Sequence, residues 1–142
     1  MAKFNFRLQA VIKVKEIQEK KIQRELAQIK KRILQEQAHL EDLEGERERM
    51  VSSSPLNGKV RAADAAMHQD YIRKISDEIH FENARLENLA EFETKKIDEV
   101  LDVKKDKEAI EHLKEKRLEE YRRELDHKEQ ILLDAVAQRL GS

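Results

Sequence analysis

The stretch Ser52-Ser53-Ser54-Pro55-Leu56-Asn57-Gly58 decides the fold, because it holds the only proline and the most turn-prone dipeptide of the chain. Proline lacks the N–H that a helix interior needs, and it disfavours helix at the residue before it. Asn-Gly readily adopts the positive φ of a turn. The sequence therefore predicts a turn over about 52–60, between a helix over about 7–50 and a helix over about 61–140. We expect residues 1–142 to form a single coiled-coil domain.

Aliphatic residues recur at alternating steps of four and three on both sides of this turn. Upstream, thirteen positions from Leu8 to Met50 follow the pattern and nine of them are apolar. Downstream the same steps run from Ile72 to Ile110, and the phase then slips near Lys114. Such a period is typical of the seam of a coiled coil. The sequence predicts an all-α fold, an antiparallel two-helix coiled-coil hairpin with a longer C-terminal helix.

A register follows if the helices fold back about position 56. Paired residues then have numbers that add to about 112, which places Leu26 beside Leu86. Four charged seam positions share layers in this register, and these are Lys15, Glu19, Glu93 and Lys96. A polar layer of this kind costs stability and can specify register.

Because the helices differ in length, residues beyond about Lys105 are predicted to lack a partner inside the chain. Their apolar positions keep a helical spacing and would need another surface. These positions are Ile110, Leu113, Leu118, Tyr121, Leu125, Leu132 and Val136. The surface could come from a partner protein, from the distal helix bending back, or from a second copy of the chain.

Composition limits the class of protein. Of 142 residues, 42% are charged and 4% aromatic, and there is no cysteine. This composition argues against a thick globular core and against Cys-ligated metal centres. Residues 1–33 hold ten Lys/Arg against three Glu, whereas residues 70–111 hold eight Lys/Arg against thirteen Asp/Glu. Opposite charge on the two helices favours their pairing.

Signals for catalysis, metal binding or nucleic-acid binding are weak. The Glu-x-x-His spacing at Glu36 and Glu124 copies one half of a di-iron site, but chance explains it in a chain so rich in acidic residues. No nucleophile triad or phosphate-binding loop is found. The basic stretch 13–32 is interrupted by glutamates and lacks aromatics for base stacking. We therefore predict no enzyme activity, catalytic residue, cofactor, metal or nucleic-acid partner, and a cytoplasmic location, since no apolar run approaches a membrane span.

Three segments resemble the FliJ family of the bacterial flagellar type III export apparatus. The first is the start, Lys3-Phe4-Asn5-Phe6-Arg7-Leu8-Gln9, an aromatic-x-aromatic-Arg-Leu-Gln pattern followed by aliphatics. The second is Tyr71-Ile72 with Ile75 and Ile79 after the turn. The third is Leu113-Lys114-Glu115-Lys116-Arg117 followed by Tyr121. The resemblance spans essentially the whole chain.

The resemblance implies a non-enzymatic, chaperone-like component of protein transport in flagellum biogenesis, and hence in motility and chemotaxis. It implies a central stalk or adaptor that binds the hexameric export ATPase, promotes its assembly, and links it to the membrane export gate and to substrate-specific export chaperones. The location implied is cytoplasmic, peripheral to the inner membrane at the flagellar base. Two alternatives stay open: the equivalent stalk of a virulence type III secretion system, and a generic coiled coil that only forms a homodimer through its distal C-terminal helix.

Two sets of partner-binding residues are predicted. The basic N-terminal arm and the distal apolar stripe place the ATPase-facing surface at the end where both termini lie. Its residues are Phe6, Arg7, Leu113, Leu118, Tyr121 and Leu125. By resemblance, Tyr71 and Ile75 near the turn are expected to contact the export gate. For the two N-terminal phenylalanines, partner anchoring competes with a hydrophobic staple at the start of the first helix.

Overall fold

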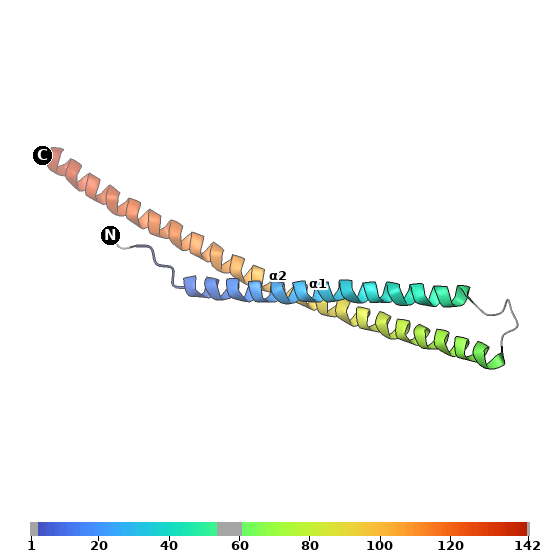
Figure 1. The fold of residues 1–142 in the computed structure, drawn as a ribbon. Coiled ribbons are helices and arrows are strands. Elements are labelled where there is room, and N and C mark those ends of the chain that lie inside the picture. Colours follow the sequence, from blue (N-terminus) through green and yellow to red (C-terminus); the bar gives the residue numbers. More distant parts are fainter. Residues whose placement is uncertain (1–2, 54–60, 142) are drawn as a thin grey trace. The chain divides into compact units, whose positions relative to one another are not determined.

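The computed structural model describes residues 3–53 and 61–141, and within these ranges it contains two helices and no strand (Figure 1). Helix α1 runs Gln9–Ser52 over 44 residues, and helix α2 runs Ala62–Gly141 over 80 residues. The fold is thus an all-α helical hairpin whose C-terminal helix is the longer one, as the sequence predicted. The predicted turn chemistry at Pro55, Asn57 and Gly58 lies outside the described residues.

The ends of α1 are defined by local hydrogen bonds. The Gln9 amide donates to the Phe6 carbonyl at 3.1 Å, which closes a turn just before the helix. At the other end the Ser53 amide donates to the Arg49 carbonyl at 2.9 Å, and the Ser53 hydroxyl donates to the Met50 carbonyl at 3.3 Å. These bonds satisfy backbone groups that a helix end leaves without partners.

The predicted seam is the buried side of both helices. Every predicted seam position from Leu8 to Met50, and from Ile72 to Ile110, is buried or half-buried. Off-seam apolar residues such as Leu34 and Phe81 are exposed. Periodicity alone therefore located the packing faces of both helices.

The helix contacts group into two compact units, which we describe separately. In the unit of residues 22–98, Leu43 of α1 packs with Ile75 and Ile79 of α2, and Leu40 and Met50 pack against this cluster. Glu25 also accepts a hydrogen bond from Lys96 at 2.7 Å. Aliphatic packing with charged flanks is the arrangement expected of a coiled coil.

The second unit contains residues 3–21 of the N-terminal part and 99–141 of α2. Ile12 and Val100 are its buried aliphatic residues. Lys107 donates to Glu19 at 2.8 Å. The hydrogen bond to Glu19 raises the pKa of Lys107, because the carboxylate favours the charged amine. A further ion pair joins Lys15 to Asp106 at 3.3 Å.

The predicted register was wrong by about one heptad. The numbers of the ion pairs Glu25–Lys96 and Lys15–Asp106 add to 121, nine more than the predicted 112. Those of the packed pair Leu43 and Ile75 add to 118, which is six more. A seven-residue repeat offers the same aliphatic seam in both registers. The sequence reasoning counted only seam charges, whereas the observed register also pairs flanking residues such as Glu25 and Asp106.

The prediction that residues beyond Lys105 lack a partner inside the chain was also wrong. Asp106 and Lys107 pair with α1, and the ring of Tyr121 contacts Phe4. Two causes add up: the one-heptad shift, and the non-helical segment before Gln9, which spans about 3.3 Å per residue instead of 1.5 Å. Within the described part of α2, an uninterrupted run of exposed residues begins only at residue 122 and continues to residue 141.

Candidate partner-binding site

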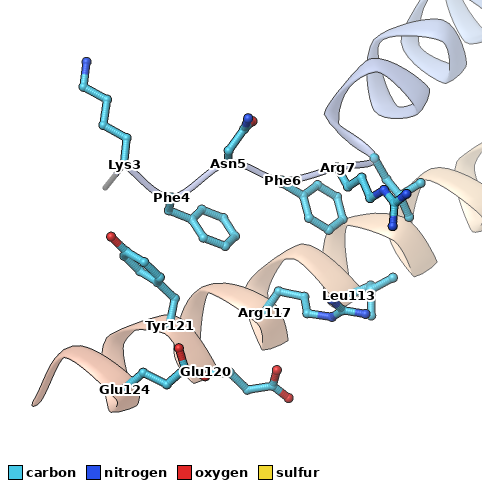
Figure 2. Close-up of a pocket in the computed structure, with 11 residues that line it drawn as sticks. Lys3, Phe4, Asn5, Phe6, Arg7, Leu113, Arg117, Glu120, Tyr121 and Glu124 are labelled. Atoms are coloured by element: carbon cyan, nitrogen blue, oxygen red, sulfur yellow. The ribbon is translucent and has the colours of Figure 1, made fainter. Parts of the chain in front are cut away.

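A groove lies between the N-terminal segment and the distal part of α2, and we call it the N-terminal groove (Figure 2). Its volume is about 870 Å³. It is lined by Lys3, Phe4, Asn5, Phe6, Arg7, Leu8, Leu113, Arg117, Glu120, Tyr121 and Glu124. All of these residues belong to the unit of residues 3–21 and 99–141.

The extended N-terminal segment aims its aromatic rings at α2. Successive side chains of an extended chain point to opposite sides, so Phe4 and Phe6 face α2 whereas Lys3 and Asn5 point away from it (Figure 2). The rings of Phe4 and Tyr121 have centroids 5.5 Å apart and planes inclined at 46°. Aromatic pairs at this separation favour tilted geometry. Phe4 thus anchors the segment on its own chain, and it is not the N-terminal staple of α1 that the sequence left open.

The α2 wall of the groove comes from a single helix face. Positions 113, 117, 120, 121 and 124 recur at steps of three and four, which places them on one side of a helix. The apolar side chains of Leu113 and Tyr121 alternate there with the charged side chains of Arg117, Glu120 and Glu124. Lys3 and Arg7 of the N-terminal segment also line the groove, which thus combines aromatic rings with three cationic and two anionic side chains.

Four of the six predicted ATPase-facing residues meet in this groove. Phe6 and Arg7 come from the N-terminal segment, and Leu113 and Tyr121 come from α2. Leu118 is half-buried and does not line the groove. Leu125, one helical turn beyond Tyr121, is 44% exposed. The structure therefore brings together four of the N-terminal and distal residues that the sequence assigned to one surface.

The two predicted gate residues differ in accessibility. Tyr71 is 39% exposed, and its hydroxyl donates a hydrogen bond to the Glu46 carboxylate. That bond raises the pKa of Tyr71, since the neutral phenol is the donor. Ile75 is only 4% exposed and belongs to the aliphatic cluster between the helices. Tyr71 is thus partly accessible at the surface, while Ile75 packs between the helices.

Sequence reasoning weighed Phe4 as a partner anchor, but it missed other groove residues, and these are Lys3, Asn5, Leu8, Arg117, Glu120 and Glu124. A signal was available, because residues 113–124 place the last three of them on the same helix face as Leu113 and Tyr121. The sequence did not indicate the register that brings this helix face to the N-terminal segment. The residue numbers of Phe4 and Tyr121 add to 125, far from the predicted 112.

Other kinds of site are not found in the described residues. Among residues 3–53 and 61–141, no three or more His, Asp or Glu side chains gather closely enough to hold a metal ion. Neither helix, over its described length, contains a segment apolar enough to cross a membrane.

Two long helices that pack against each other, a charged surface and an aromatic groove define a charged coiled-coil hairpin. Within that class the chain belongs to the family of the flagellar FliJ protein, whose family model matches residues 4–142. The resemblance noted from the sequence is therefore confirmed over essentially the whole chain. The comparison with curated proteins and the comparison with solved structures return no match. Family membership indicates a component of the flagellar export apparatus, a role for which no enzyme activity is known.

Proposed function

We propose that this protein is the central stalk or adaptor of a flagellar export ATPase, and that it acts without catalysing a reaction. The observation that carries this proposal is the family match over residues 4–142. In this role the protein binds the hexameric ATPase, promotes assembly of its ring, and links it to the membrane export gate and to export chaperones. Its place is the cytoplasmic side of the inner membrane at the flagellar base.

The N-terminal groove and the adjoining distal helix are the proposed ATPase-binding surface. Aromatic residues and arginine are enriched where binding energy concentrates in protein interfaces, and the groove presents Phe6, Arg7 and Tyr121 together. Leu125 extends this surface by one turn. For the gate we propose Tyr71 as the contacting residue, with Ile75 in a supporting position.

A binding measurement tests the proposal. The variant Arg7→Ala/Leu125→Ser removes one cation and one exposed leucine from the surface, and both changes leave the aliphatic cluster at Leu43 untouched. Burying a leucine in an interface is worth about 1.5–3 kcal/mol, so we expect binding to the purified ATPase hexamer to weaken by more than about tenfold. Stimulation of ATP hydrolysis should fall in parallel.

Leu34→Ser provides the matched control, because Leu34 is an exposed leucine of α1 in the other unit. It should bind like the wild type. Unchanged binding of the double variant, together with loss of ATPase binding in Tyr71→Ala, would place the ATPase contact near the turn and refute the proposed surface.

A further inference from the structure

A layer of two glutamates interrupts the aliphatic seam in the unit of residues 22–98, and we call it the acidic layer. Glu36 of α1 and Glu82 of α2 form it, and both carboxylates contact the same nitrogen of Arg85, at 3.6 Å and 3.2 Å. Glu82 is only 3% exposed, and it is the one charged residue that is buried among the residues that the structure describes. Ile79 lies one turn before Glu82 and Leu40 one turn after Glu36, so the layer adjoins the aliphatic cluster.

Two arginines and one histidine surround the acidic layer. Arg32 of α1 donates to Glu36 Oε1 at 3.1 Å. Arg85 of α2 donates to Glu82 Oε2 at 3.2 Å, and its guanidinium lies 3.6 Å from Glu36 Oε2. His39 of α1 is exposed and contributes only at longer range. The cations thus compensate the charge of Glu36 and reach one oxygen of Glu82.

The other oxygen of Glu82 has no hydrogen-bond donor within the described residues. Glu82 Oε1 is buried, and the carboxyl group of Glu36 lies beside that of Glu82 at the guanidinium of Arg85. Two ionised carboxylates have no hydrogen between them, and an unsatisfied buried oxygen is costly. One added proton removes both problems, since a protonated Glu82 donates to the ionised Glu36.

We propose that Glu36 and Glu82 share one proton and that this proton controls how tightly α1 and α2 pair in residues 22–98. Lowering the pH fills the site and tightens the pairing, and raising the pH empties it and loosens the pairing. The inference concerns the hairpin itself and does not depend on the proposed binding to an ATPase.

The directions of the pKa changes agree with this geometry. Burial, followed by the hydrogen bond with Glu36, raises the pKa of Glu82 above its usual value of 4.5. The hydrogen bond from Glu82 lowers the pKa of Glu36. Because the pKa of Glu82 is higher in the folded state than in the unfolded state, Glu82 stabilises the folded state fully at pH below its unfolded pKa. This stabilisation is lost as pH rises through the pKa of the folded state. The lowered pKa of Glu36 stabilises the folded state above the unfolded pKa, and this stabilisation is lost as pH falls through the folded-state pKa. The acidic layer therefore contributes most to stability near the ordinary pKa of glutamate.

Urea unfolding of the full chain between pH 4.5 and 9, followed by circular dichroism, tests the proposal on wild type and Glu82→Gln. Glutamine resembles the protonated acid, because its amide can donate to Glu36 and its oxygen can accept from Arg85. Release of one proton changes the unfolding equilibrium constant by at most about tenfold per pH unit. We expect the wild type to lose stability relative to Glu82→Gln as pH rises, until Glu82 is fully ionised.

Glu119→Gln is the matched control, since Glu119 forms an exposed ion pair with Arg123 in the other unit. It should follow the wild type at every pH. A difference between wild type and Glu82→Gln that stays constant with pH overturns the proposal. If the glutamine variant is destabilised at every pH to a varying extent, the carboxyl ¹³C resonances of the wild type decide. A Glu82 pKa at or below the ordinary glutamate pKa refutes the shared proton. A Glu82 pKa above it supports the shared proton.

Discussion

Phe4 shows how a single residue positions the candidate site. The chain has only four phenylalanines and two tyrosines, and one of each is used to hold the N-terminal segment on α2. The contact between Phe4 and Tyr121 holds the segment before Gln9 on α2, in addition to the local turn that the Gln9 amide closes. The shape of the groove therefore depends on this aromatic pair.

We predict that Phe4→Ala releases the N-terminal segment without unfolding α1. Aromatic pairs contribute about 0.5–1.5 kcal/mol beyond the area they bury, which is comparable to the cost of about 1–2 kcal/mol for fixing the backbone of one residue. The ring resonances of Tyr121 should shift toward those of an exposed tyrosine, and amide exchange in residues 4–8 should accelerate.

Phe81→Ala is the control for this experiment, because the Phe81 ring is exposed on α2 and lies in the other unit. It should leave the Tyr121 resonances unchanged. A Tyr121 spectrum that is identical in Phe4→Ala and wild type would contradict the anchoring role of Phe4.

At the scale of the helices, the register is what sequence reasoning could not fix. Each predicted seam position is on the packing side, since the spacing of Leu26, Leu43 and Ile75 depends only on local periodicity. Register depends on the summed contact energies of residues from both helices. A heptad repeat makes registers that differ by seven residues nearly equivalent for aliphatic side chains. Flanking ion pairs such as Glu25 with Lys96 then distinguish the registers, and each pair contributes little by itself.

A cross-linking experiment checks the register directly, because the chain has no native cysteine to interfere. We predict that Glu25→Cys/Lys96→Cys is joined rapidly by a short bis-maleimide, since these side chains meet at 2.7 Å in the structure. The pair Leu26→Cys/Leu86→Cys, which the 112 register would place side by side, should react slowly. Reversed rates would restore the register expected from the position of the turn.

At the scale of the whole chain, sequence and structure contributed different parts of the result. Composition and periodicity predicted the all-α hairpin and its longer second helix, because both properties are encoded locally. The N-terminal groove and the acidic layer needed the register, because Phe4 and Tyr121, like Glu36 and Glu82, are far apart in sequence. Family membership came from the ordered pattern of residues 4–142 and not from any single motif.

The described part of α2 beyond Tyr121 exposes apolar side chains, which lets an experiment separate two contributions to the proposed ATPase binding. Leu125, Leu132 and Val136 lie on one helix face at steps of seven and four, and all three are exposed. Residues 1–33 carry the excess of seven positive charges. Charge governs the rate of encounter and is screened by salt, whereas desolvated apolar contacts govern dissociation.

We therefore predict that Leu132→Ser/Val136→Ser accelerates dissociation from the ATPase hexamer by about tenfold or more, given about 1.5–3 kcal/mol for each fully buried side chain, with little change in association. Raising the ionic strength from about 0.1 M to about 1 M shortens the Debye length from about 10 Å to about 3 Å, and it should slow association of wild type and variant alike. Ile131→Ser, on a different face of the same turn, is the control and should dissociate like the wild type. Surface-based binding kinetics measure the rates of association and dissociation. If Leu132→Ser/Val136→Ser associates more slowly but dissociates like the wild type, then Leu132 and Val136 do not lie inside the complex.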